Sequence, residues 1–229
     1  MRSVIIHGQS HEGSTCHAAR LLTDRLGGEV EEFFLPRDFD AFCTGCRACF
    51  LNSEELCPHR HDLRPLIEAI DRADVIVLAS PCYVLRTTAA MKSFLDHCAY
   101  RFMLHRPNPA MFSKQGVCIS TGAGTTGGTN ADMAASLRWW GVGKIYRVGF
   151  RVFSTTWEDV AEKKKTQIRR RMEKLAGVIL KNAGRARASL VTRGIFTVCR
   201  IFNRKAPGGR DKAYWEEQGW LEKQRPWQS

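Results

Sequence analysis

Four cysteines lie within a 15-residue stretch of the sequence, and their spacing is typical of a metal site. Cys43, Cys46, Cys49 and Cys57 are separated by two, two and seven residues, and Pro58 follows the last of them. A 4Fe–4S cluster needs four converging thiolates, and two short spacings followed by a more distant cysteine can supply them. Zinc is a weaker alternative, because its structural sites more often use two separated Cys-x2-Cys pairs. Four plain thiols on one loop are the other open interpretation, beside the cluster.

A polar turn near the N-terminus has the features of a phosphate-binding loop. It runs from Gly8 to Thr15, follows an apolar segment, and ends in hydroxyl side chains where a helix is expected to begin. Backbone N–H groups at a helix N-terminus attract anions, and the hydroxyls of Ser10, Ser14 and Thr15 can add hydrogen bonds. Ser14 and Thr15 are equally compatible with a simple helix cap. A Walker loop is excluded, because Ser14 follows Gly13 where that motif requires lysine.

A second loop, Ser80-Pro81-Cys82-Tyr83-Val84, follows the apolar run 75–79. Pro81 has no N–H group and ends the strand, which leaves Tyr83 at the carboxyl edge of the sheet. An aromatic ring at this edge suits a flat aromatic ligand. The alternative interpretation is a ring that packs at the rim of the core.

The third loop is rich in glycine and follows the apolar run 116–120. It contains a Gly-x-Gly-x-x-Gly sequence that begins at Gly122, as in a dinucleotide-binding fingerprint. That fingerprint also requires an acidic residue about 20 positions further on, which binds a ribose hydroxyl. No Asp or Glu occurs between Asp132 and Glu158. We therefore interpret residues 120–124 as flexible backbone that approaches one edge of a ligand held by the other two loops.

The elements that position these loops alternate along the first two thirds of the chain. Short apolar runs predict strands, and segments of helical period predict helices between them. The expected strands are 3–7, 30–35, 75–79, 116–120 and 144–153, and the expected helices are 14–26, 62–73, 88–103 and 130–140. This alternation is typical of an α/β fold with a doubly wound parallel sheet. Ligands bind such sheets outside the carboxyl ends of the strands, where the three loops begin.

In these loops the sequence resembles the flavodoxin-like NAD(P)H-dependent FMN reductases and their iron–sulfur flavoprotein relatives. The matching motifs are Gly13-Ser14-Thr15, Ser80-Pro81-Cys82-Tyr83 and Met91-Lys92-Ser93-Phe94-Leu95-Asp96. The resemblance implies a flavodoxin-like five-stranded sheet of order 2-1-3-4-5, noncovalently bound FMN, NAD(P)H as co-substrate and a homodimer. The cysteine spacing also resembles the compact motif of the iron–sulfur flavoproteins, which implies a 4Fe–4S cluster on Cys43, Cys46, Cys49 and Cys57.

By this resemblance, three groups of residues would contact FMN. Ser10, Gly13, Ser14 and Thr15 would bind its phosphate, Pro81, Cys82, Tyr83 and Val84 would line its isoalloxazine ring, and Ser120, Thr121, Gly122, Ala123 and Gly124 would close the other side. Ser10 and His11 stand near a basic position of the family pattern, so amides and hydroxyls must neutralise more of the phosphate charge. The flavin performs the hydride chemistry, so no protein acid or base is required, and Tyr83 is the side chain expected nearest to it.

The charge of the 229-residue chain is unevenly distributed. Residues 1–160 contain 17 basic and 17 acidic side chains, whereas residues 161–229 contain 18 basic and 6 acidic ones, so the net charge of +12 belongs to the last third. A helix over 158–182 is expected to pack through an apolar stripe and to expose its basic face. The stretch 184–229 has too many large apolar side chains for a free tail. We therefore expect a domain over 1–183 and an extension that folds back on it or on a second subunit, with a part that covers the active site.

Several classes of protein are disfavoured. The longest apolar run without a charge, 75–85, is about half of the roughly 20 residues that a membrane-spanning helix needs, and residues 1–8 turn polar too early for a signal peptide. We expect a cytoplasmic protein with reduced cysteines and no nucleic-acid partner. The leading hypothesis is an FMN-dependent oxidoreductase that passes electrons from NAD(P)H to a small-molecule or protein acceptor. The alternatives are an iron–sulfur electron-transfer module and a nonenzymatic binder of nucleic acid or anionic lipid.

Overall fold

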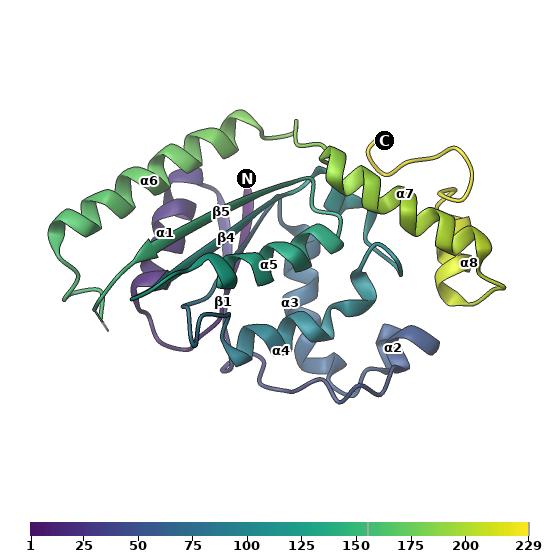
Figure 1. Ribbon diagram of the computed structural model, residues 1–229, viewed down its shortest axis with the longest axis horizontal. Coiled ribbons are helices and arrows are strands. Elements are labelled where there is room, and N and C mark those ends of the chain that lie inside the picture. The colour runs from purple at the N-terminus through teal and green to yellow at the C-terminus, as the bar shows by residue number, and fades with distance from the viewer. Residues whose placement is uncertain (155, 229) are drawn as a thin grey trace.

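The computed structural model describes residues 1–154 and 156–228, and a parallel sheet of five strands lies at its centre (Figure 1). The strands are β1 (Arg2–His7), β2 (Glu29–Phe34), β3 (Val75–Ala79), β4 (Gln115–Gly122) and β5 (Lys144–Arg151). Their order is β2-β1-β3-β4-β5, and every neighbouring pair is parallel. The predicted order 2-1-3-4-5 is therefore confirmed. The strand order reverses between β1 and β3, so the loops that follow these two strands flank the switch point.

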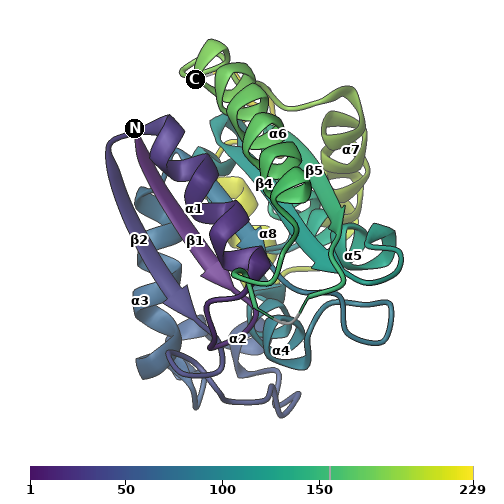
Figure 2. The same cartoon turned by 90° about the vertical axis from the view of Figure 1, so that its left-hand side faces the viewer.

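Helices cover both faces of the sheet. α1 (Ser14–Leu26) and α6 (Glu162–Lys181) pack on one face, and α3 (Arg60–Arg72), α4 (Ala89–His97) and α5 (Gly127–Trp139) pack on the other (Figure 2). Alternate residues of each strand point to the two layers, so Val4 and Ile6 belong to one core and Ile5 to the other. β3 is buried along its whole length, as a central parallel strand must be.

The helix predicted over 88–103 ends early, at His97. Cys98 leaves the α-helical pattern, and its N–H group donates to Leu95 O at 3.2 Å in a tighter turn. Two 3-10 segments, Ala99–Arg101 and Pro109–Ser113, follow before β4 begins. In this stretch Met103 and Phe112 are buried in the core shared with the C-terminal region, whereas Cys98 and Met111 are buried in the core of the sheet domain, so their apolar character does not mark a helical face.

The C-terminal residues form a further layer of helices. α7 (Leu190–Lys205) and α8 (Arg210–Glu217) lie at the right-hand end of the molecule in Figure 1. An aromatic core attaches them to the sheet domain and contains Met103, Phe112, Ala188, Phe196, Cys199, Trp215 and Trp220. Trp215 Nε1 donates to His105 O at 2.7 Å, so the buried indole also satisfies its polar atom.

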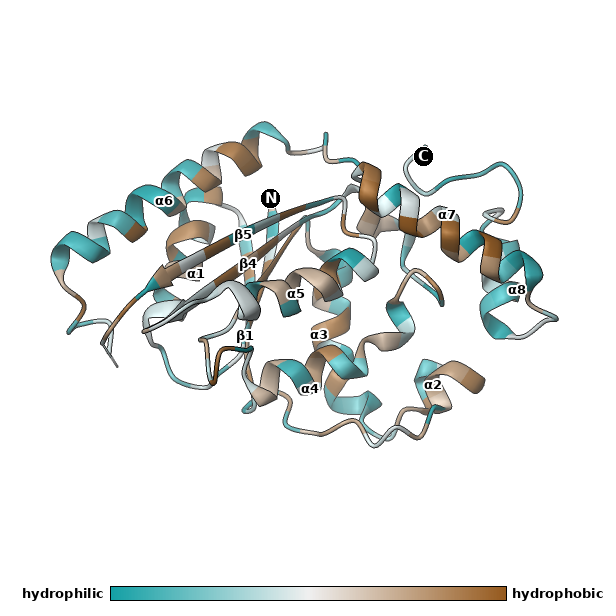
Figure 3. Ribbon diagram, in the orientation of Figure 1, coloured by the Kyte–Doolittle hydropathy of each residue, from teal (hydrophilic) through white to brown (hydrophobic). Residues whose placement is uncertain are grey.

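Hydropathy along the chain follows these layers. The sheet is most apolar in its central strand β3, whereas the outer side of α6 is hydrophilic (Figure 3). The apolar stripe of α6 packs on the sheet through Ile168, Met172, Leu175, Ala176 and Ile179. The basic side chains of this helix therefore form a solvated face, as its pattern predicts. None of the helices in the described parts of the chain combines the length and the hydropathy that a membrane crossing requires.

Buried His7, at the end of β1, should make the stability of the fold depend on pH. Its ring stacks on Phe34, and its Nε2 atom lies 2.9 Å from Glu32 Oε2. Burial lowers the pKa of His7 below the ordinary imidazole value of about 6.5, although the contact with Glu32 opposes this shift. The unfolded chain therefore binds the proton more tightly. This contribution to stability is complete above about pH 6.5 and is lost as the pH falls from there toward the folded-state pKa.

We expect urea titrations to give a lower free energy of unfolding at about pH 5.5 than at about pH 7.5. The difference should be smaller in His7→Gln, which removes the buried imidazole. His11→Gln changes an exposed histidine of the neighbouring loop and should keep the wild-type difference. Identical pH dependence in wild type and His7→Gln would contradict this explanation.

Candidate functional site

The loop after β1 is held tightly against β3. The N–H group of Gly8 donates to Ala79 O at 2.7 Å, and a Cβ atom at Gly8 would approach Ser80 Oγ to 2.9 Å. Thr88 Oγ1 donates to Gly8 O at 2.6 Å and also caps α4 by accepting from Met91 N. Glycine at position 8 therefore allows a close approach that joins this loop to the start of α4.

Ser14 and Thr15 begin α1 without capping it. Gly13 is the N-cap residue, and none of the described side chains caps this helix. Ser14 Oγ is buried and has no hydrogen-bond partner among the described residues. Thr15 Oγ1 lies 2.6 Å from Thr121 Oγ1 and so joins the loops after β1 and β4. The simple capping interpretation is therefore wrong, and an unpaired hydroxyl beside the free N–H groups of α1 fits a bound anion.

The loops after β3 and β4 pack on each other. Cys82 N donates to Thr121 O at 2.8 Å, and a Cβ atom at Gly122 would lie 2.9 Å from Cys82 Cβ. Tyr83 Oη donates to Gln9 Oε1 at 3.2 Å, which connects the loop after β3 to the loop after β1. The Tyr83 side chain is 51% exposed, so it lies at the sheet edge and not in the core. The three loops are thus connected pairwise.

The turn beyond Tyr83 holds two non-glycine residues in left-handed conformations. Val84 has a φ of 49° and Leu85 has a φ of 65°. Tyr83 and Arg86 exchange two backbone hydrogen bonds of 3.0 Å across them, and Arg86 is anchored by its ion pair with Asp132. Two-residue turns of this kind favour Asn-Gly, because positive φ is costly for a branched side chain. Val84 is 95% exposed, so packing does not offset the strain.

Replacing Val84 with Asn and Leu85 with Gly should therefore stabilise the protein. Each left-handed non-glycine residue costs on the order of 1–3 kcal/mol, and the entropy of glycine in the unfolded chain offsets part of the gain. We expect a net gain of about 1 kcal/mol, measured as a rise in Tm of roughly 2–4 °C. Val198→Asn changes an exposed valine within α7 and should give no such gain. A Tm at or below that of wild type would contradict the prediction.

The loops after β1, β3, β4 and β5 enclose a cavity of about 480 Å³. This volume lies within the roughly 300–1,000 Å³ of small-molecule sites. The predicted residues that line it are Gly13, Ser14, Thr15, Pro81, Cys82, Tyr83, Thr121, Gly122 and Ala123. Sequence reasoning missed further lining residues, namely Gln9, His11, Val152, Phe153 and Ser154. The last three could have been found from the fold rule, because the carboxyl end of β5 lies beside that of β4.

The other predicted flavin contacts do not line this cavity, namely Ser10, Val84, Ser120 and Gly124. Ser10 Oγ donates to Leu35 O, and the buried Ser120 Oγ donates to Thr126 O, each at 3.4 Å. Among the described residues, none from 184–228 lines the cavity, so the extension does not cover it within the same chain. None of the described lining residues is Lys or Arg either. An anion bound here would be met by amides and hydroxyls.

The four cysteines of the loop after β2 surround a smaller cavity of about 60 Å³, here called the thiol cavity. α2 (Ala48–Leu51) carries Cys49, and a 3-10 turn, Glu54–Leu56, leads to Cys57. All four are free thiols. Burial, followed by the influence of the other three thiols, raises the pKa of Cys49. Four cysteines on one small cavity give the convergence that sulfur ligands of a single metal centre need.

Two histidines complete the wall of the thiol cavity. His59 Nδ1 lies 2.8 Å from His97 Nε2, and His97 Nδ1 lies 2.8 Å from Ser93 O. One potential ligand atom from each of Cys57, His59 and His97 falls within 4.8 Å of the others. No spacing motif in the sequence predicts that His97 lies beside the cysteine loop. The donor types suit an iron–sulfur cluster, and they also suit zinc.

A parallel sheet of order 2-1-3-4-5 with a ligand cavity at its carboxyl edge defines a flavodoxin-like α/β protein. An NAD(P)H:quinone oxidoreductase from Methanothermobacter marburgensis shares this fold, with a TM-score of 0.58 and 18% identity over 76% of this chain and 96% of that one. A flavone reductase gives a TM-score of 0.58 and 17% identity over 82% of this chain and 66% of that one. Residues 1–150 match the model of the NADPH-dependent FMN reductase family, so the chain belongs to that family.

Two iron–sulfur flavoproteins are similar in sequence. The one from Archaeoglobus fulgidus is 31% identical over 148 residues, which are 63% of this chain and 64% of that relative. The one from Methanosarcina thermophila is 26% identical over 153 residues, which are 65% of this chain and 78% of that relative. The match therefore spans less than two thirds of the Archaeoglobus protein. These similarities confirm the family resemblance predicted from the three loops.

Proposed function

We propose that this protein is an FMN-dependent oxidoreductase that takes electrons from NAD(P)H and passes them to a small-molecule or protein acceptor. The observation that carries the proposal is the buried, unpaired Ser14 hydroxyl at the start of α1, in a cavity bounded by the three family loops. Family membership supports FMN and a nicotinamide reductant. The names of the two fold neighbours, a quinone oxidoreductase and a flavone reductase, agree with a reductase role.

The residues of this site would bind and orient the flavin. The N–H groups of α1 and the hydroxyls of Ser14 and Thr15 would hold the phosphate, as amides and hydroxyls must where no basic side chain lines the described wall. The loops after β3 and β4 would enclose the ring, and Tyr83, tethered to Gln9, would shield its edge from water. Bound FMN supplies hydride acceptance and electron donation.

The visible spectrum and NADPH oxidation test this proposal directly. Protein supplemented with FMN and freed of excess ligand should show flavin absorbance that corresponds to about one FMN per chain. It should then oxidise NADPH in the presence of ferricyanide as a one-electron acceptor. A protein that remains colourless after FMN addition would refute the proposal.

An electron-transfer role for the cysteine loop is a second candidate, favoured by the convergence of four thiols on one small cavity. We propose that Cys43, Cys46, Cys49 and Cys57 hold a 4Fe–4S cluster, which would supply one-electron chemistry beside the flavin domain. The iron–sulfur flavoprotein relatives support this assignment. By the same family resemblance we propose a homodimer. Light scattering should then give a mass of twice 25.9 kDa.

A further inference from the structure

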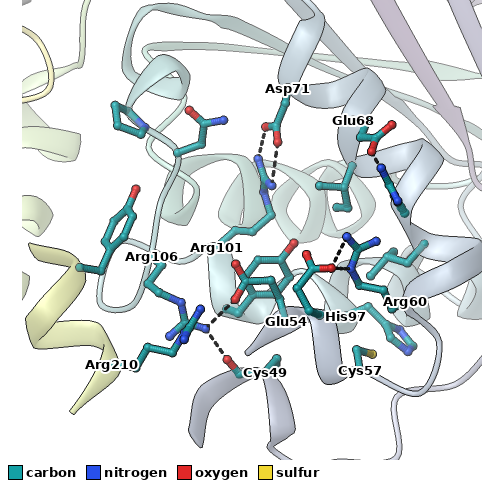
Figure 4. Close-up of a pocket in the computed structure, with 18 residues that line it drawn as sticks. Cys49, Glu54, Cys57, Arg60, Glu68, Asp71, His97, Arg101, Arg106 and Arg210 are labelled. Atoms are coloured by element: carbon teal, nitrogen blue, oxygen red, sulfur yellow. Dashed lines mark hydrogen bonds and ion pairs between the residues drawn. The ribbon is translucent and has the colours of Figure 1, made fainter. Parts of the chain in front are cut away.

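A third cavity, of about 560 Å³, lies where the sheet domain meets the C-terminal helices (Figure 4). α3, the turns after α4, the cysteine loop and α8 all contribute to its wall. The family match ends at residue 150, whereas Arg210 and Tyr214 of α8 complete this wall. We call it the arginine cavity, because it is lined by Arg60, Arg64, Arg101, Arg106 and Arg210. The C-terminal region thus adds a cavity to the family fold.

Two arginines that are more than nine-tenths buried hold this wall in place. Arg101 is 5% exposed and pairs with Asp71 of α3. Arg106 is 8% exposed, donates to Cys49 O and pairs with Asp211 of α8. One guanidinium therefore ties the cysteine loop to the C-terminal helix, with the planar fork of donors that arginine offers. Because these side chains are already held in place, less conformational entropy is lost when a ligand binds.

The charges on the wall leave one guanidinium without a counter-ion. Four of the arginines form ion pairs with carboxylates, which are Arg60 with Glu55, Arg64 with Glu68, Arg101 with Asp71 and Arg106 with Glu54. Arg210 has no carboxylate partner among the described residues, and its hydrogen bond is to Ser53 Oγ at 3.4 Å. An unpaired guanidinium can bind a carboxylate, sulfonate or phosphate group through two N–H donors. Arg210 is exposed, and it is therefore the arginine of this wall whose donors are available to an anion.

Besides its five arginines and four carboxylates, the wall contains an apolar and aromatic part against which a flat ring can pack. Leu63 and Ile67 of α3 line one part of it, and the rings of Tyr100 and Tyr214 line another. Tyr214 Oη donates to Pro107 O at 2.7 Å, which fixes the position of its ring. Apolar and aromatic walls with a few well-placed polar groups are typical of small-molecule sites.

We propose that the arginine cavity binds a planar small molecule with an anionic substituent, which pairs with Arg210. Cys49 and Cys57 stand in the walls of both the arginine cavity and the thiol cavity. On this basis, and resting on the proposed function, the ligand is the electron acceptor. NAD(P)H then supplies two electrons and one proton as a hydride, and solvent supplies a second proton. The acceptor gains two electrons and two protons, and NAD(P)H becomes NAD(P)⁺.

Calorimetric titration with anthraquinone-2-sulfonate tests the site, using full-length protein loaded with FMN and no NAD(P)H. Wild-type protein should bind the probe, and added salt should weaken the binding because the substituent is charged. Arg210→Ala should lower the affinity about tenfold or more, because it removes a charge-assisted hydrogen bond. Arg210→Glu should abolish measurable binding. Arg185→Ala, which changes an exposed arginine outside the cavity, should bind like wild type.

A second variant tests the cavity without a substitution in α8, because the Arg210 substitutions could disturb that helix. Ile67→Trp fills the cavity from α3, so it should block the probe while α8 is unchanged. Wild-type affinity in Arg210→Ala, Arg210→Glu and Ile67→Trp would overturn the proposal. Failure of the proposed function is a separate result, because it appears as absent NADPH oxidation by the wild-type protein with ferricyanide.

Discussion

Ser14→Asp should strongly weaken FMN binding at physiological pH. The carboxylate would stand at the start of α1, where the phosphate is expected, and two like charges about 4 Å apart cost about 4 kcal/mol near a protein surface. We therefore expect the Kd for FMN to rise at least about 100-fold, measured by quenching of flavin fluorescence. Ser14→Ala removes a single hydrogen bond to a charged group and should raise the Kd roughly 10-fold or more. The prediction also requires that Ser14→Asp raises the Kd for FMN more than Ser14→Ala does.

The matched control is Ser189→Asp, at the N-cap of α7. It makes the same change at another helix start, where Ser189 Oγ already accepts from Thr192 N, and FMN affinity should be unchanged. An aspartate in the first turn of a helix is also compatible with its dipole, so circular dichroism of Ser14→Asp should match wild type. Tight FMN binding by a folded Ser14→Asp protein would rule out α1 as the phosphate site.

Cys46→Ser should remove the metal from protein purified without oxygen. Cys46 is exposed on the loop, so its side chain contributes little to packing, and its thiolate is one of the four proposed ligands. We expect about four iron atoms per wild-type chain and nearly none in the variant, together with loss of the brown absorbance shoulder. FMN content should remain, because Cys46 does not line the cavity enclosed by the loops after β1, β3, β4 and β5, where FMN is proposed to bind.

Cys82→Ser is the matched control for this experiment. Cys82 lies in the loop after β3, and its Sγ atom contacts Thr125 O and not the thiol cavity. Its replacement should leave the iron content unchanged. Metal analysis also separates the alternatives for the loop, because zinc in place of iron would favour a zinc site. Wild-type protein without any metal would leave four plain thiols.

The sheet and its central helices could be predicted because their signals are local. β3 and α1 have the bounds that their apolar periods predict, Val75–Ala79 and Ser14–Leu26. α4 was expected to run to 103 because apolar residues continue beyond His97. Those residues are buried by tertiary packing, with Met103 in the aromatic core of α7 and α8. An apolar side chain indicates that a residue is buried, whereas only the spacing of apolar side chains indicates a helix. A short irregular segment beneath another layer is therefore easily mistaken for a helix.

Parts of the candidate site could be predicted for the same reason. Pro81, Cys82 and Tyr83 follow a buried parallel strand directly, so the fold alone brings them to the ligand edge. His97 and Arg106 contact the cysteine loop from positions far along the chain, and no spacing rule relates them to Cys57 or Cys49. Contacts of this kind arise only when separate elements pack together.

Residue order along the chain was enough to predict the parallel α/β sheet, the three loops at its carboxyl edge and the basic character of the last third, because periodicity, turn residues and charge depend on residues that are close in sequence. Three features depended on tertiary packing. Among the described residues, the Ser14 hydroxyl is unpaired and is not a cap, His97 lies in the wall of the thiol cavity, and the C-terminal region lines the arginine cavity and not the cavity lined by Ser14. The positions of these groups relative to distant parts of the chain are set only when the layers pack.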